Sequence, residues 1–232
     1  MRKAASSLGL ATGLAMLMAT GAIEPASARN RTEREPGTVT ITLRVYDYVR
    51  VDGPGLLAAE GEAAAILAQA GVEARWVECP TSEAELDKYP DCASAWQATD
   101  FPLRVLPKAM VGSHAGWQEA LGSTPECGRV GTCTSSIFFD RVNGLAEGAS
   151  ATLPVLLGRA MAHEIGHLLL GPNSHSRTGI MRAFWSGEEL SLAARPYLLF
   201  TPEQSQRMKT RLSERAQDWQ AEAKLGSEPK PR

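Results

Sequence analysis

Two histidines and a glutamate stand at the spacing that binds and uses a metal ion. His163 and His167 are four residues apart, and Glu164 follows the first of them. In an α-helix, residues four apart lie on one face, so both imidazoles can reach one ion at about 2 Å. Glu164 then lies where a carboxylate can act as general base on a metal-bound water. The pattern predicts one catalytic zinc ion (Zn²⁺) and hydrolytic chemistry.

The segment from Leu153 to Leu170 is the helix that must carry these residues. Pro154 suits the first turn, and Gly171-Pro172 suits the stop. The alternative is an ordinary core helix whose histidines are satisfied by other partners. However, two imidazoles and a carboxylate in an apolar helix need polar partners, and one metal with one water would supply them. Three of the four histidines in the chain also lie between positions 163 and 175, which favours the metal site.

A catalytic zinc site takes three protein ligands and leaves one position open. His175 is the candidate for the third ligand, because Gly171 and Pro172 end the helix and the short loop Asn173-Ser174 can turn the chain back. A glutamate on a later element, Glu188 or Glu189, is the alternative third ligand.

The first half of the chain predicts a β-α-β unit. Residues 38–51 alternate between apolar and polar side chains, which is typical of a half-buried strand. Residues 56–70 are rich in Ala, Leu and Glu and are followed by Gly71, which predicts a helix and its stop. Residues 72–78 predict a second strand. The pattern favours an α/β or α+β sheet domain.

The remaining elements are harder to place. We expect strands at 102–106 and 135–142, a short strand at 115–121, a loop at 122–133, and a final helix from Thr201 to about Lys224. His114 lies directly before the strand expected at 115–121, and we assign it no role.

The N-terminus resembles a secretory signal peptide. Arg2 and Lys3 precede an uncharged, largely apolar stretch and the small triplet Ala26-Ser27-Ala28. We expect a signal peptide at 1–28, a polar linker at 29–37, one catalytic domain at 38–224 and a disordered tail at 225–232. The expected location is secreted or periplasmic, without stable membrane insertion after cleavage. The net charge of −2 gives no indication of nucleic-acid binding.

Four cysteines in an exported chain favour disulfides over a zinc knuckle, because no pair has the knuckle spacing. Three pairings are possible. The local one would close two loops that contain Pro or Gly, and it joins Cys79 to Cys92 and Cys127 to Cys133. Cys79 could alternatively act as a switch cysteine on the metal.

The segment from His163 to His175, followed by Met181, resembles the metzincin clan of zinc peptidases. That clan has a His-Glu-x-x-His-x-x-Gly-x-x-His signature and a downstream methionine turn. The spacing here has one extra residue before the glycine and one more after it. The segment His-Ser-x-x-Gly-Ile-Met also resembles a group of secreted bacterial metzincin-like proteins. The resemblance assigns the ligands to His163, His167 and His175, the base to Glu164, the turning glycine to Gly171 and the Met-turn to Met181.

The resemblance implies an α+β zincin fold, with a mixed twisted sheet, an active-site helix and a C-terminal helix. It also implies an edge strand near residues 135–142, to which an extended peptide or protein substrate could add by backbone hydrogen bonds. Two other functions stay open: hydrolysis of a non-peptide amide or ester, and a zinc-stabilised binding protein without turnover. The presence of Glu164 favours the enzyme. The sequence does not predict an oligomeric state.

Overall fold

The structure is a computed structural model that describes residues 38–112, 120–125, 133–171, 173–191 and 196–225. The predicted signal peptide, the linker, His114, Cys127 and almost all of the predicted tail lie outside these residues. The described part is mixed α+β, as expected, with helices and one five-stranded sheet. Its strands are β1 (Val39–Asp47), β2 (Val72–Cys79), β3 (Asp100–Leu106), β4 (Gly122–Ser123) and β5 (Ser135–Phe138).

The strand order in the sheet is β2-β1-β3-β5-β4. Strands β2, β1, β3 and β5 run parallel to one another, and β4 is antiparallel to its neighbour β5. The sheet is therefore mixed, and β4 forms one of its edges.

The predicted β-α-β unit is confirmed, with helix α1 (Gly53–Gln69) between the parallel strands β1 and β2. The Asp52 side chain caps the helix by accepting a hydrogen bond from the backbone N–H of Gly55 at 2.8 Å. Gly71, which follows the helix, has φ of +73°, a conformation that glycine adopts without strain.

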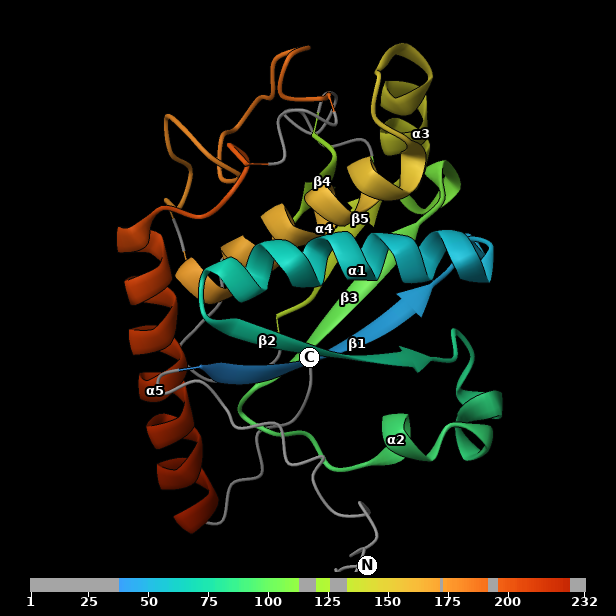
Figure 1. Ribbon diagram of the computed structural model, residues 1–232. Coiled ribbons are helices and arrows are strands. Elements are labelled where there is room, and N and C mark those ends of the chain that lie inside the picture. Colours follow the sequence, from blue (N-terminus) through green and yellow to red (C-terminus); the bar gives the residue numbers. More distant parts are fainter. Residues whose placement is uncertain (1–37, 113–119, 126–132, 172, 192–195, 226–232) are drawn as a thin grey trace, which may run out of the picture. The chain divides into compact units, whose positions relative to one another are not determined.

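Helix α4 (Leu153–Leu170) has the bounds that the sequence predicts. It packs along α1 on one face of the sheet, as Figure 1 shows. The buried face of α4 and the sheet residues Ile41, Leu43 and Leu103 belong to one hydrophobic core, which fixes the helix relative to the strands.

The C-terminal helix α5 (Pro202–Lys224) packs against α4 and is also as predicted. Thr201 and Gln204 form a capping box at its start. The shorter helices are η1 (Glu83–Lys88), α2 (Pro90–Ala93), η2 (Lys108–Met110) and α3 (Phe139–Gly148). No helix in the described part of the chain has both the length and the apolar character of a membrane span.

The structure corrects three sequence-based expectations between residues 120 and 148. The predicted strand at 135–142 ends at Phe138, and the chain continues as helix α3. This strand lies inside the sheet, so it is not the expected edge. The edge is β4, which lies in the segment expected to be a loop. Most of the short strand predicted at 115–121 lies outside the described residues.

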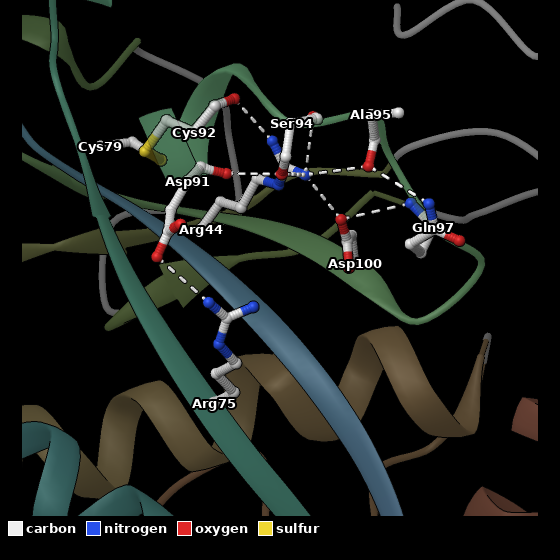
Figure 2. A network of polar contacts seen from close by, with 9 residues as sticks. All are labelled: Arg44, Arg75, Cys79, Asp91, Cys92, Ser94, Ala95, Gln97 and Asp100. Atoms are coloured by element: carbon white, nitrogen blue, oxygen red, sulfur yellow. Dashed lines mark hydrogen bonds and ion pairs between the residues drawn. A yellow bond between two sulfur atoms is a disulfide. The ribbon is translucent and has the colours of Figure 1, made fainter. Parts of the chain in front are cut away.

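Arg44 departs from the alternating pattern of β1, since its side chain is 2% exposed. Its guanidinium pairs with Asp100 at 2.7 Å and donates to the carbonyl oxygens of Cys92, Ser94 and Ala95, as Figure 2 shows. The segment that carries these carbonyls is also joined to β2 by the predicted disulfide Cys79–Cys92. The ion pair and the disulfide together hold this segment over the sheet face that α1 and α4 leave uncovered. Cys133 is disulfide-bonded as well.

Candidate metal centre

Helix α4 brings His163 and His167 together as the four-residue spacing predicts. Their Nε2 atoms are 3.1 Å apart, and the ring centroids are separated by 4.8 Å. His175 joins them from the loop after the helix, with ring centroids 5.4 Å from His163 and 4.7 Å from His167. One ligand atom from each of the three histidines lies within 4.8 Å of the others. The three side chains could therefore hold a metal ion.

The outer nitrogens of the two helical histidines have fixed partners. His163 Nδ1 lies 2.8 Å from the carbonyl oxygen of Ile180, and His167 Nδ1 lies 2.7 Å from Ser174 Oγ. A carbonyl only accepts hydrogen bonds, so Nδ1 of His163 carries the proton and its Nε2 presents a lone pair. Such partners orient ligating histidines in metal sites and increase their basicity. The arrangement directs both Nε2 atoms to one point.

The electrostatics of the site keep the imidazoles neutral, as metal ligands must be. Burial lowers the pKa of His163 to about 4 and the pKa of His167 to about 3. Burial also lowers the pKa of His175. A neutral imidazole with its lone pair facing two others needs a cation or a proton donor between them, and a metal ion meets that need.

Glu164 lies beside the three histidines but is turned toward the sheet edge. It is 5% exposed, and its Oε2 accepts a hydrogen bond from Thr124 Oγ1 at 2.6 Å. Burial raises the pKa of Glu164 to about 7, against the opposing effect of the Thr124 hydroxyl. A carboxyl group with that pKa can both take and release a proton near neutral pH.

A turn brings Met181 to the inner face of α4. The backbone N–H of Ser176 donates to the Met181 carbonyl at 2.8 Å, and Gly179 takes a φ of +76° inside this turn. Met181 is fully buried against Gly166, where an added Cβ would overlap its sulfur atom. Gly166, which lies just before His167, therefore gives the methionine its space.

The histidines and Glu164 line a cleft of about 1020 Å³. One side of the cleft is formed by β4 and the residues next to it, and another by the segment 182–190. The lining combines apolar side chains with the three histidines and two arginines, and Glu164 is its one acidic residue among those the structure describes. The further lining residues include Leu121, Arg141, Leu145, Ala160, Arg182, Phe184, Trp185 and Leu190.

Arg159 holds the segment 182–191 against the metal-site helix. It lies one turn before His163, it is fully buried, and its Nη1 donates to the carbonyl oxygens of Glu189 and Ser191 at 3.0 and 2.9 Å. Its Nε lies 3.6 Å from Glu62 of α1. The helix that carries the ligands thus also anchors one side of the cleft.

Comparison with known proteins adds no family to this geometry. No model of a known protein family matches the chain, and no curated protein matches it. The assignment of the site rests on the residues of this chain alone.

The alternative third ligands do not join the histidines. Among the residues that the structure describes, the group whose ligand atoms converge contains neither Glu188 nor Glu189. Glu189 instead pairs with Arg182 at 2.7 Å and accepts a hydrogen bond from the Ser186 backbone at 2.7 Å. Cys79 is bonded to Cys92 and has no free thiol for a metal.

Several residues of the site have no signal in the sequence. Ser174, Thr124 and Arg159 are single polar residues, and nothing in their local sequence shows that they contact His167, Glu164 and the cleft segment. Only Ser174 could have been suspected, because it lies next to the candidate ligand His175 and metal-bound histidines need a partner for their second nitrogen.

Proposed function

We propose that this protein is a secreted or periplasmic zinc-dependent hydrolase, most specifically a metzincin-like metallopeptidase with a zincin fold. The observation that carries the proposal is the convergence of His163, His167 and His175 in one cleft that also contains Glu164. The disulfide Cys79–Cys92 supports an oxidising compartment.

The donor set favours zinc over other metals. Three neutral imidazoles leave one position of a tetrahedron open, which is the arrangement of catalytic zinc sites. Calcium and magnesium prefer oxygen ligands, and non-haem iron sites typically combine two histidines with a carboxylate. Here the nearby carboxylate, Glu164, is engaged by Thr124 instead.

The chain's own residues then perform the proton transfers. Bound zinc would supply Lewis acidity toward the substrate carbonyl and toward the attacking water. Glu164 accepts a proton from that water at its carboxylate and delivers it to the leaving amine. The raised pKa of Glu164 suits both steps, since the group changes protonation near neutral pH. The apolar residues Leu121, Leu145 and Trp185 reduce the access of bulk water to the cleft.

The position of β4 supports a peptide as substrate. This strand is at the sheet edge and also lines the cleft beside Glu164. An extended peptide can pair with an edge strand through main-chain hydrogen bonds, with little dependence on its side chains. A peptide bound in this way would pass in front of the three histidines.

The test is to measure bound zinc by elemental analysis and cleavage of labelled casein by purified protein. We expect one zinc ion per chain in the wild type and in Glu164→Gln, with casein cleavage lost by about 10²-fold or more in the variant. Full zinc without cleavage would contradict the hydrolase and support a zinc-stabilised binding protein. Full zinc in His175→Ala would contradict His175 as the third ligand. Cleavage of an ester probe but not of casein would contradict the peptidase alone.

A further inference from the structure

Thr124 contacts the carboxylate of Glu164 from the edge of the sheet. This residue directly follows β4, and its Oγ1 lies 2.6 Å from Glu164 Oε2. An ionised carboxylate can only accept hydrogen bonds, so the threonine hydroxyl is the donor. Hydrogen bonds of this charge-assisted type are short and about twice as strong as neutral ones.

Ser135 completes a chain of hydroxyl groups. Its Oγ lies 2.6 Å from Thr124 Oγ1 and 3.2 Å from the backbone carbonyl of Glu164, and the residue is fully buried on β5. When the single hydroxyl proton of Thr124 goes to Glu164, the proton between the two hydroxyl groups comes from Ser135. Hydrogen bonds in such a chain polarise and strengthen one another. Thr124 thus contacts the carboxylate of Glu164, and Ser135 contacts Thr124 and the backbone carbonyl of the same glutamate.

Gly122 makes this approach of β4 possible. A Cβ atom at this position would lie 2.6 Å from Cγ of Glu164 and 2.6 Å from the carbonyl oxygen of Ser136. Neither overlap can be accepted without moving the strand or the glutamate. The backbone of Gly122 and the hydroxyl of Thr124 therefore confine the Glu164 side chain at its stem and at its end.

We propose that Thr124, supported by Ser135, is a positioning residue that fixes the carboxylate of Glu164 beside the three histidines. Its hydroxyl donates a hydrogen bond to Oε2 of Glu164, so the other carboxylate oxygen, Oε1, is left for the attacking water. A glutamate side chain has several rotatable bonds. A side chain that is already held by a hydrogen bond loses less conformational entropy when the reaction begins. The effect on turnover rests on the proposed function, whereas the placement of the carboxylate does not.

The variants separate this role from a merely structural one. Thr124→Val keeps the shape of the side chain and removes the hydroxyl, and Thr124→Ser keeps the hydroxyl. Ser135→Ala removes the supporting donor. Thr40→Val is the matched control, because it also removes a threonine hydroxyl that donates to a glutamate, Glu73 at 3.0 Å, and neither residue lines the cleft.

The first measurement does not depend on activity. Urea unfolding of the metal-free protein is compared for Thr124→Val in the wild-type background and in Glu164→Ala. We expect Thr124→Val to raise the unfolding equilibrium constant about 10-fold in the wild type and less than about 2-fold in Glu164→Ala. Equal effects in both backgrounds would overturn the proposal, because Thr124 would then stabilise the loop and not the carboxylate.

The second measurement is turnover of fluorescein-labelled casein at full zinc occupancy. We expect Thr124→Val to lower kcat about 10- to 100-fold with KM changed less than about 2-fold, and Thr124→Ser to restore most of kcat. Unchanged kcat in Thr124→Val, or an equal loss in Thr40→Val, would overturn the proposal. If the wild-type protein with full zinc cleaves no casein, the proposed peptidase function fails, and the unfolding comparison alone decides on Thr124.

Discussion

His163 Nδ1 lies 2.8 Å from the carbonyl oxygen of Ile180, the residue immediately before Met181. Trp185 donates its Nε1–H to the same oxygen at 3.3 Å. One carbonyl in the methionine-containing turn therefore orients a candidate metal ligand and also binds a residue that lines the cleft. The turn after the metal-site helix links the shape of the cleft to the geometry of the ligands, and the equivalent support for His167 comes from Ser174.

Removal of the Ser174 hydroxyl should weaken metal binding without removing a ligand. Ser174→Ala leaves His167 Nδ1 without its partner at 2.7 Å, so the ring loses its fixed orientation. We expect the dissociation constant for zinc, measured by competition with a chromophoric chelator, to rise about 10- to 100-fold. Ser176→Ala is the control, because the Ser176 hydroxyl donates to the Thr178 carbonyl. Equal zinc affinity in the Ser174 and Ser176 variants would argue against this support of His167.

Substitution of Gly166 should displace Met181 from the metal-site helix. A Cβ at Gly166 would overlap the sulfur of Met181 and lie 2.8 Å from Phe200. We expect Gly166→Ala to lower the free energy of unfolding by about 1–3 kcal/mol in urea titrations, despite the higher helix propensity of alanine. Gly61→Ala on α1, where no atom lies within 4 Å of the new Cβ, should instead stabilise by about 0.5–1 kcal/mol. The same stabilisation at both sites would contradict the packing of Met181.

Glu60 should make stability depend on pH. Burial, and then the negative charge of Glu78, raise the pKa of Glu60 in the folded protein to about 7, and no residue that the structure describes forms a hydrogen bond with its Oε1. The folded state thus favours the protonated carboxyl. The stability that this group contributes is fully present below about pH 4.5 and is lost as pH rises through 7.

Urea unfolding of Glu60→Gln tests that dependence, since an amide does not titrate. We expect the variant to gain stability relative to the wild type between pH 5 and pH 8, with most of the gain complete near pH 8. Glu78→Gln should make this gain smaller, because the charge of Glu78 is one of the two causes of the raised pKa of Glu60. A constant difference between Glu60→Gln and the wild type across this range would contradict the raised pKa.

Loss of Arg159 should both destabilise the protein and release one side of the cleft. Arg159→Met removes the cation that lies 3.6 Å from the buried carboxylate of Glu62 and removes the two hydrogen bonds to Glu189 and Ser191. We expect a loss of about 3–5 kcal/mol in the free energy of unfolding and faster proteolytic cleavage within 183–191. The double variant with Glu62→Leu should recover part of the stability but none of the protection from proteolysis. Recovery of both would show that Arg159 does not anchor this segment.

The metal-site helix could be predicted in full because its signals are local. Pro154 and Gly171 set its ends, and the spacing of His163 and His167 is a property of any helix. The β-α-β opening followed from periodicity, whereas Cys79–Cys92 belongs to one of three pairings that the sequence left open.

The parts that sequence did not predict depend on tertiary contacts. Residues Ile137 and Phe138 have strand propensity, but nothing local shows that Phe139 begins a helix. Strand β4 has two residues, one of them glycine, and exists through its pairing with β5. Arg44 fits the polar face of an exposed strand, yet the segment that carries Cys92 covers it.

His163, His167 and His175 are proposed to bind one zinc ion beside Glu164. The most direct test is a crystal structure of the zinc-loaded protein with anomalous diffraction measured at the zinc absorption edge. We expect one anomalous peak at about 2.0–2.1 Å from Nε2 of His163, Nε2 of His167 and a ring nitrogen of His175. A structure without that peak, or with a carboxylate as the third protein ligand, would contradict it.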